Sequence, residues 1–314
     1  MAPNIVKLFA GFCMLYFGSE FLVRGGVNIA LSLRIKKLII GLTLCAFGTS
    51  SPEFVVSFLA GLNKSYDVCI GNVVGSNISN IFLVLGIAAI IRPIKIDNQL
   101  LKIDFPVFLI TVGFFVAICF SGEITRITGS MMLVFLLLYL LLLMKNGREE
   151  EIGDSAVSGI KKRKTAWDSA VAVTGLAVLI AGGDFTVRGA VGIADAFNIS
   201  KLFIGLTVVA IGTSLPELFA SSVASYRRHG DISIGNVLGS NIFNICFVLG
   251  VVSLFFPLSV PKDVIRFDNW CLLAGSLFVG LIAYKKRKIG RREGIFLLLL
   301  YVIFIFCIYV RASG

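Results

Sequence analysis

The sequence predicts an all-α polytopic membrane protein with ten transmembrane helices, arranged as two inverted five-helix repeats. Three observations predict this fold: the apolar composition, an internal repeat, and the odd number of spans in each half. Hydrophobic residues make up 57% of the 314 residues and charged residues only 15%, whereas a soluble domain is typically about 25% charged. The mean hydropathy is +0.94. An apolar segment of about 20 residues crosses the hydrocarbon core as a helix, so the chain has room for many spans.

The apolar segments fall into two groups of five, separated by a polar linker predicted at 146–167. The linker carries the charged run 148–151 and the basic cluster 161–164. It divides the chain into a first repeat at 1–145 and a second repeat at 168–314. The predicted spans are 5–23, 38–60, 68–91, 104–121, 128–145, 168–187, 201–224, 232–256, 267–284 and 294–310.

The two halves are related in sequence. A shift of 164 residues places 41–86 on 205–250, and about 25 of these 46 positions are identical. Repeats of this kind determine the architecture. Because each half holds five spans, the second half begins on the opposite side of the membrane from the first. The repeats are therefore expected to be inverted, an arrangement that places a transporter's site near the bilayer midplane.

The positive charges predict the orientation. The net charge is +11, and the cations cluster between apolar segments, a placement typical of contacts with lipid headgroups rather than with nucleic acid. About 21 Lys and Arg residues lie on the face that includes the linker, and about 8 lie on the other face. The positive-inside rule then places the linker in the cytoplasm and both termini outside the cell, in a multi-pass protein of the cell membrane. Nothing in the sequence implies an obligate protein partner.

Two glutamates lie in the central part of predicted spans. Glu53 follows Gly48-Thr49-Ser50-Ser51-Pro52, and Glu217 occupies the same position after 212–216 in the second half. A charge at the bilayer centre costs at least about 3 kcal/mol. No Lys or Arg lies in the central part of any span, so a bound cation is the natural partner of the two carboxylates.

The residues around the glutamates are rich in oxygen. Pro52 and Pro216 lie inside predicted helices, where proline removes one backbone hydrogen bond and frees carbonyl oxygens. A second motif, 71–80, recurs at 235–244. Within it a serine and an asparagine lie four residues apart and share one helix face. These pairs are Ser76 with Asn80 and Ser240 with Asn244.

Such a ligand set predicts a hard cation. Carboxylate, hydroxyl, amide and carbonyl oxygens suit Ca²⁺, which accepts six to eight flexible ligands, better than Mg²⁺. Several Na⁺ ions could occupy the same oxygens. The only histidine, His229, lies in a predicted loop, and the seven cysteines lie in or beside apolar segments without CxxC spacing. Neither a zinc site nor a disulfide framework is therefore expected. The pattern indicates a transporter rather than an enzyme, with no cofactor. Glu20 and Arg24, and likewise Asp184 and Arg188, are four apart and predict ion pairs near span ends.

The paired motifs GTSSPE with GNVVGSNISN, and GTSLPE with GNVLGSNIFN, resemble the cation/calcium exchanger superfamily in its sodium/calcium exchanger branch, of prokaryotic type. The resemblance implies exchange of Na⁺ for Ca²⁺ by alternating access, with spans 1 and 6 as the mobile pair. It implies that Glu53 and Glu217 hold Ca²⁺ together with the carbonyls of Thr49 and Thr213. It also implies flanking Na⁺ sites formed by the residues Ser50, Ser76, Ser214, Ser240, Ala46 (carbonyl) and Ala210 (carbonyl).

One departure concerns the last position of the second motif, where some members of the superfamily carry an aspartate. This chain has Asn80 and Asn244 there, so the centre holds two acidic groups, which argues against potassium-dependent exchange. The alternative left open is an H⁺/Ca²⁺ antiporter that uses the same glutamates, although the glutamate-containing GN motif of proton/calcium exchangers is absent. A passive channel and a non-transporting scaffold are the remaining alternatives, and broken helices in repeats disfavour the channel.

Overall fold

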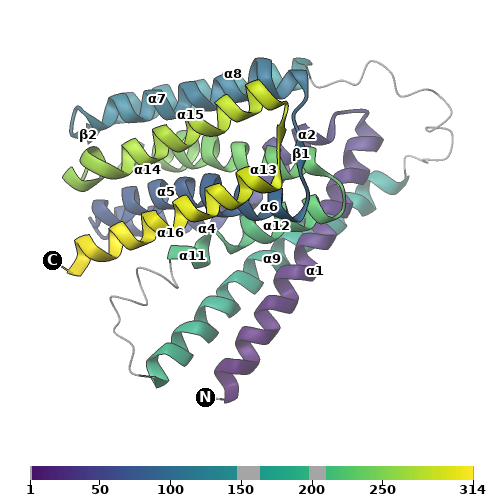
Figure 1. Cartoon of the computed structure of the whole chain (residues 1–314), viewed down its shortest axis with the longest axis horizontal. Helices are drawn as coiled ribbons and strands as arrows, with labels where there is room; N and C mark the ends of the chain where they lie inside the picture. Colours follow the sequence, from purple (N-terminus) through teal and green to yellow (C-terminus); the bar gives the residue numbers. More distant parts are fainter. Residues whose placement is uncertain (1, 147–162, 198–209, 314) are drawn as a thin grey trace.

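The computed structural model describes residues 2–146, 163–197 and 210–313, and it is almost entirely helical. Figure 1 shows most of the helices running side by side along the long axis of the molecule. The helices of the first half are α1 (Ala2–Leu33), α2 (Lys37–Ile40), η1 (Gly41–Cys45), α3 (Ala46–Thr49), α4 (Ser51–Leu62), α5 (Tyr66–Ser79), η2 (Asn80–Val84), α6 (Leu85–Ile91), η3 (Leu100–Asp104), α7 (Phe105–Cys119) and α8 (Arg126–Asn146).

The second half repeats this order from α9 onward. Its helices are α9 (Arg163–Ala196), α11 (Ala210–Thr213), α12 (Leu215–Tyr226), α13 (Gly230–Phe243), η6 (Asn244–Leu249), α14 (Gly250–Phe255), η7 (Val264–Asp268), α15 (Asn269–Lys286) and α16 (Arg291–Ser313). The elements labelled η are π-helical segments, and those at η2 and η6, and at η3 and η7, lie at equivalent places in the two halves.

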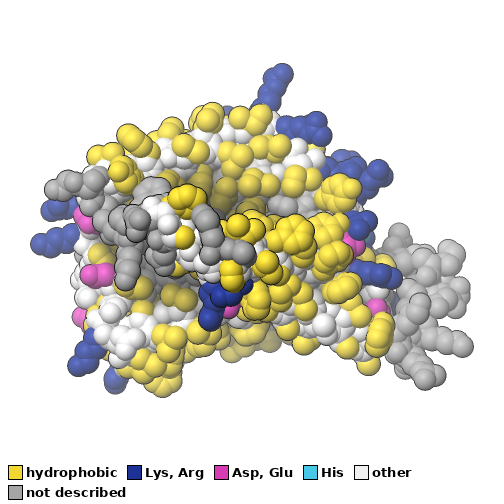
Figure 2. All heavy atoms as spheres, turned by 90° about the horizontal axis from the view of Figure 1, so that it is seen from below, with side chains coloured by type: hydrophobic (Ala, Val, Ile, Leu, Met, Phe, Trp, Pro, Cys, Tyr) yellow, Lys and Arg dark blue, Asp and Glu magenta, His cyan; other side chains and the backbone are white. Residues whose placement is uncertain are grey.

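The predicted membrane character is borne out by the helices. In the described part of the chain, eight helices are long and apolar enough to cross a bilayer, and a ninth is formed if the bent pair Lys37–Thr49 and Ser51–Leu62 is one span. The predicted seventh span, 201–224, lies partly outside the described residues, which contain its second part as α11 and α12. Of the predicted linker, 147–162 also lies outside them, and α9 begins at Arg163 within it. Hydrophobic side chains cover the middle of the surface seen in Figure 2, and Lys and Arg lie mainly toward its two ends.

Short strand pairs connect the two halves at their ends. Strand β1 (Ile94–Lys95) pairs antiparallel with β4 (Lys288–Ile289), and β2 (Glu123–Ile124) pairs with β3 (Leu258–Ser259). Each pair therefore joins one strand of the first half to one of the second. The strand pairs hold a segment between helices of the first half against one of the second half, and the helices form the core.

Helices α1 and α9 form a separate layer that crosses the other helices at an angle (Figure 1). They pack side by side and antiparallel, because Gly18 faces Leu179 and Gly175 faces Leu22. A Cβ atom added to Gly18 would lie 2.5 Å from the Leu179 nitrogen, so the two backbones are in direct contact. Small residues permit this approach between membrane helices. We call these glycines the glycine seam: Gly11, Gly18, Gly25, Gly175, Gly182 and Gly189, spaced seven residues apart on each helix.

The site lies where the two halves interlock. Helix α13 of the second half packs against η1 and α3 of the first, and α5 of the first half packs against α11 of the second. Within each half, α4 packs on α5 and α12 packs on α13. The GTS and GN motifs of both halves therefore meet at one place inside the bundle.

Candidate cation-binding site

Each glutamate lies in the first turn of a helix that begins directly after a break. The chain bends by 42° between Thr49 and Ser51, and Ser50 leaves the helical conformation with a ψ angle of 2°. Ser214 does the same with a ψ angle of 4°. The prolines were expected to interrupt helical hydrogen bonding within their spans, and each lies in the first turn of the segment that follows the break, where a missing N–H removes no helical hydrogen bond.

The break gives each carboxylate a favourable end of a helix. Glu53 and Glu217 lie in the first turns of α4 and α12, where the helix dipole stabilises negative charge. The preceding segments, α3 and α11, end with carbonyl groups directed toward the break, and such ends favour a cation. Broken helices of this kind are typical of midplane sites in transporters.

Both carboxylates are fully buried, with exposed fractions of 0%. One oxygen of each accepts a hydroxyl hydrogen bond: Ser76 Oγ donates to Glu53 Oε1 at 3.0 Å, and Ser50 Oγ donates to Glu217 Oε1 at 3.4 Å. The other oxygen of each, Oε2, has no hydrogen-bond partner within the described structure. A buried carboxylate oxygen without a partner is strongly disfavoured, so each Oε2 is an acceptor that the described structure leaves unsatisfied.

Ser76 is the centre of the hydroxyl network. Ser214 Oγ donates to Ser76 Oγ at 3.3 Å, and Asn244 Nδ2 donates to the same oxygen at 3.3 Å. Ser76 thus connects the Glu53 carboxylate of the first half with two predicted ligands of the second. The sequence placed Ser76, Ser214 and Asn244 at one site, and the structure brings them together.

A second group of predicted residues gathers around Thr49. The hydroxyls of Thr49 and Ser240 lie 3.3 Å apart. The Ala46 carbonyl accepts hydrogen bonds from Thr49 Oγ1 at 3.4 Å and from Ser240 Oγ at 3.5 Å. The Thr49 carbonyl was expected to be the ligand, and its hydroxyl is the group seen in this network.

Three predicted residues stand apart from these networks. Asn80 is fully buried, and neither polar atom of its side chain has a hydrogen-bond partner in the described structure. Thr213 ends α11 and is partly buried. Ala210 begins α11, and its side chain lies outside the described part. The π-helical segments η2 and η6 begin at Asn80 and Asn244, and such segments are frequent at functional sites.

Two asparagines were missed by the sequence reasoning. Asn72 Nδ2 donates to the Glu53 carbonyl at 3.2 Å and to Ser57 Oγ at 2.9 Å. Asn236 repeats this in the second half, with distances of 3.5 Å to the Glu217 carbonyl and 2.9 Å to Ser221 Oγ. They hold the backbone of each glutamate against α5 or α13. The sequence contained a signal for these two asparagines. Asn72 precedes Ser76 by one helical turn, and Asn236 precedes Ser240 in the same way in the second half.

The chemistry of the site is that of oxygen ligands. Among the residues that the structure describes, no group of three or more His, Cys, Asp or Glu side chains could hold a metal. The two carboxylates are instead surrounded by hydroxyl and amide groups. Two ionised carboxylates at one buried site would repel each other, and a divalent cation between them would remove this repulsion. A cavity of about 100 Å³, lined by Phe47, Ser50, Ser51, Phe54, Phe243 and Phe247, adjoins the site at Ser50.

Comparisons with known proteins identify the family. The sequence pattern described as sodium/calcium exchanger protein matches residues 4–145 and again 168–310. The uncharacterized membrane protein MJ0091 of Methanocaldococcus jannaschii is 39% identical over 295 residues, covering 93% of this chain and 94% of its own length. The sodium/calcium exchanger MaX1 of Methanosarcina acetivorans is 31% identical over 344 residues, covering 98% of both chains.

The solved structures agree with the sequence relatives. A structure of the sodium-calcium exchanger NCX_Mj, soaked with 10 mM Na⁺ and zero Ca²⁺, superposes with a TM-score of 0.86 at 37% identity. The match covers 96% of this chain and 97% of that one. The all-helical membrane fold and the resemblance drawn from the paired motifs are thereby confirmed. The chain belongs to the sodium/calcium exchanger protein family.

Proposed function

We propose that this protein exchanges Na⁺ for Ca²⁺ across the cell membrane by alternating access. One observation carries the proposal: two fully buried glutamates, at equivalent positions of the two halves, each keep one carboxylate oxygen without a hydrogen-bond partner in the described structure. Two carboxylates balance the charge of one Ca²⁺ ion. Membership of the exchanger family supports an exchanger over a channel or a scaffold.

The proposed Ca²⁺ ligands are Glu53 and Glu217 with the carbonyls of Thr49 and Thr213. The proposed Na⁺ ligands are the hydroxyls of Ser50, Ser76, Ser214 and Ser240 with the carbonyls of Ala46 and Ala210. Both groups consist of oxygen donors, as hard cations prefer. Ser50 and Ser76 each donate a hydrogen bond to a glutamate. Na⁺ bound to these hydroxyls would therefore change the hydrogen bonds of the carboxylates that bind Ca²⁺. Shared ligands of this kind make binding of Na⁺ and Ca²⁺ competitive, which coupled exchange requires.

The proposed architecture has ten spans in two inverted repeats, 1–145 and 168–314, joined by a cytoplasmic linker. Antiparallel packing of α1 on α9, equivalent elements of the two halves, supports the inversion. The equivalent placement of η2 and η6 supports the repeat. The distribution of Lys and Arg supports termini outside the cell.

Alternating access needs one part of the protein to move against another. The layer formed by α1 and α9 is the proposed mobile part, because it crosses the other helices at an angle and packs on them through a small hydrophobic cluster, separate from the main core, that also includes residues of α2, η1, α12 and α13. The glycine seam keeps its two helices in backbone contact. The layer would then shift as one body and expose the glutamates to each side in turn.

The test is a flux assay with purified protein in liposomes. Vesicles loaded with Na⁺ and diluted into Na⁺-free buffer containing ⁴⁵Ca²⁺ should take up ⁴⁵Ca²⁺, and dissipation of the Na⁺ gradient should stop the uptake. The assay is repeated with a pH gradient in place of the Na⁺ gradient. Uptake that follows the pH gradient and ignores Na⁺ would contradict Na⁺ coupling, and uptake with net conductance in the absence of any counter-ion would contradict exchange.

A further inference from the structure

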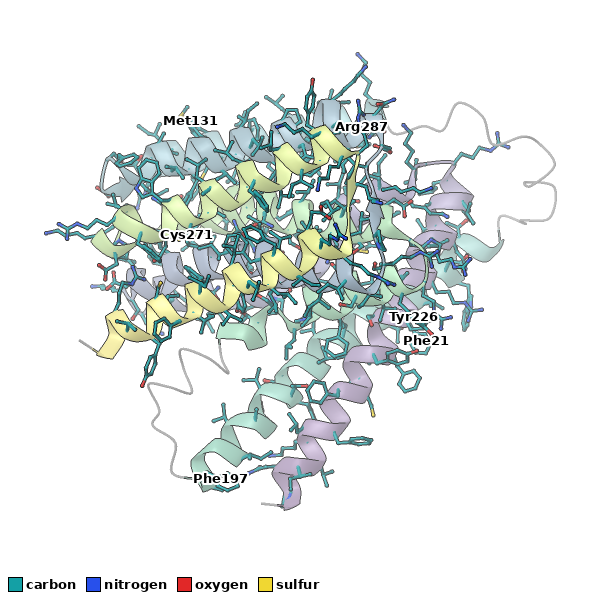
Figure 3. The ribbon with its side chains drawn as sticks, viewed as in Figure 1. Phe21, Met131, Phe197, Tyr226, Cys271 and Arg287 are labelled. Carbon is teal, nitrogen blue, oxygen red and sulfur yellow. The ribbon has the colours of Figure 1, made fainter. Side chains whose placement is uncertain are left out.

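A basic pocket lies at the end of the molecule where β1 pairs with β4, away from the glutamates. Its volume is about 620 Å³. Tyr226 and Arg287, labelled in Figure 3, mark this end of the molecule. The pocket is built from both halves, with Lys37, Arg92 and Lys95 from the first and Arg228 and Gly230 from the second.

The pocket has an excess of positive charge. Lys37, Arg92, Lys95 and Arg228 line it, against two carboxylates, Asp97 and Asp231. Each carboxylate has one oxygen that accepts a hydrogen bond from a following residue's backbone: Asp97 Oδ1 accepts from the Leu100 N–H at 2.7 Å, and Asp231 Oδ1 accepts from the Ile232 N–H at 3.0 Å.

Within the part of the chain that the structure describes, none of the four cations takes part in a salt bridge. Burial and the positive charge of Lys37 lower the pKa of the neighbouring His229 below its usual range. The start of helix α13 at Gly230 also lines the pocket, and a helix N-terminus adds partial positive charge.

The repeat supplies an internal control. Shifted by 164 residues, Arg92 corresponds to Phe256 and Lys95 to Ser259 at the opposite end of the molecule. The Phe256 ring packs against Phe58, with 6.1 Å between ring centroids, and lies beside Gly61. The fold thus provides equivalent places at both ends, and only one of them carries this pair of cations. This pair of cations therefore belongs to the face on which most of the Lys and Arg residues lie.

We propose that this pocket binds a phosphate group, carried by an anionic phospholipid headgroup or free in solution. Four cations around a cavity suit a group with several negative oxygens. Ile91, which precedes Arg92, is an exposed large hydrophobic residue with an exposed fraction of 37%, so the pocket adjoins surface that lipid can cover. Because loops of both halves line it, an occupant would bridge the two repeats.

The experiment measures binding by native mass spectrometry on the full chain in detergent. The probes are phosphatidylglycerol, phosphatidylcholine and inorganic phosphate, each titrated separately, with phosphate also added as a competitor of the lipid. The test variant is Arg92→Gln/Lys95→Gln. The matched control is Lys64→Gln/Lys262→Gln, which removes two cations outside the pocket. A charge-preserving variant, Arg92→Lys/Lys95→Arg, separates the effect of charge from the effect of substitution.

Phosphatidylglycerol should bind the wild type, the control and the charge-preserving variant alike, and phosphatidylcholine weakly to all. Since each cation near a surface contributes roughly fivefold, the test variant should bind phosphatidylglycerol about 25-fold more weakly. A soluble phosphate would be assigned to the pocket by a different result: inorganic phosphate binds the test variant about 25-fold more weakly than the wild type, while phosphatidylglycerol and phosphatidylcholine bind with equal affinity. Equal binding of phosphatidylglycerol and of phosphate to the test variant and the wild type would overturn the proposal, as would an equal loss in the control. Unfolding temperatures of the variants, measured in parallel, exclude misfolding as the cause.

Discussion

Replacing a single glycine of the seam should destabilise the protein and slow transport. A Cβ atom at Gly175 would lie 2.5 Å from the Leu22 nitrogen and 2.8 Å from the Gly18 carbonyl oxygen. Ordinary contacts of a Cβ atom are about 3.4–4 Å, so Gly175→Ala must push the two backbones apart by about 1 Å. The obstacle is backbone on both sides, and no rotamer change can relieve it.

The magnitude follows from two opposing effects. Overpacking typically costs about 1–3 kcal/mol, whereas alanine is more favourable than glycine in a helix by about 1 kcal/mol. The matched control is Gly113→Ala in α7, where an added Cβ meets nothing within 4 Å. The control should therefore gain up to about 1 kcal/mol, while Gly175→Ala should lose up to about 2 kcal/mol net.

The assay is thermal unfolding in detergent, combined with Na⁺-driven ⁴⁵Ca²⁺ uptake in liposomes. The gap between the two variants is the overpacking cost of about 1–3 kcal/mol, which corresponds to unfolding temperatures that differ by roughly 2–12 °C. Uptake by Gly175→Ala should be slower than uptake by Gly113→Ala at a temperature where both are folded. Equal unfolding temperatures and equal uptake in the two variants would refute the claim that backbone contact holds α1 and α9 together as one moving layer.

Three further outcomes are expected. Asn80→Asp should change the preference between Na⁺ and Ca²⁺ in binding assays while the protein stays folded, because it adds a third acid at a buried site; an unchanged preference would mean that this position does not act on the ions. Asn236→Leu should lower the free energy of unfolding by about 2 kcal/mol and weaken ⁴⁵Ca²⁺ binding, because it leaves two buried hydroxyl groups without their amide partner; full stability would show that the amide is not needed there. Arg227→Gln removes the 2.8 Å ion pair with Glu20 that connects α1 to the end of α12, and it should change the rate of uptake without changing unfolding. The exposed intrahelical pair of Arg188 is the control, and an identical rate in Arg227→Gln and Arg188→Gln would contradict a role for the α1 contact.

The positions of the membrane helices could be predicted from the sequence because the bilayer demands long apolar segments. The predicted span 68–91 corresponds to the observed Tyr66–Ile91, and 232–256 corresponds to Gly230–Phe255. The short strands could not be predicted. Each has two residues and pairs with a strand in the other half, so no local pattern marks it.

The candidate site was predictable where the repeat doubled the signal. Two buried glutamates at an offset of 164 residues indicated a shared centre, and the hydrogen bonds of Ser76 and Ser50 agree with it. Asn72 was not selected as a site residue, although its repeat at Asn236 was visible in the sequence; that it donates to the Glu53 carbonyl and to Ser57 depends on how α4 packs on α5.

The exact position of the helix break and the partner of Glu20 could not be predicted from local sequence spacing alone. The proline pattern predicted an interruption of the helix, and the break falls at Ser50, with Pro52 as the second residue of the next helix, α4. Glu20 and Arg24 predicted a pair within α1 by their spacing. The structure instead pairs Glu20 with Arg227, which is 207 residues away in sequence.

The central claim is that Glu53 and Glu217 together hold the transported Ca²⁺. The most direct measurement is equilibrium ⁴⁵Ca²⁺ binding to the purified protein, with Na⁺ as competitor, for Glu53→Gln, Glu217→Gln and the exposed control Glu123→Gln. Wild type and control should bind ⁴⁵Ca²⁺ and release it as Na⁺ is added, and both site variants should lose binding while they remain folded. Retained, Na⁺-sensitive ⁴⁵Ca²⁺ binding in either site variant would contradict the account.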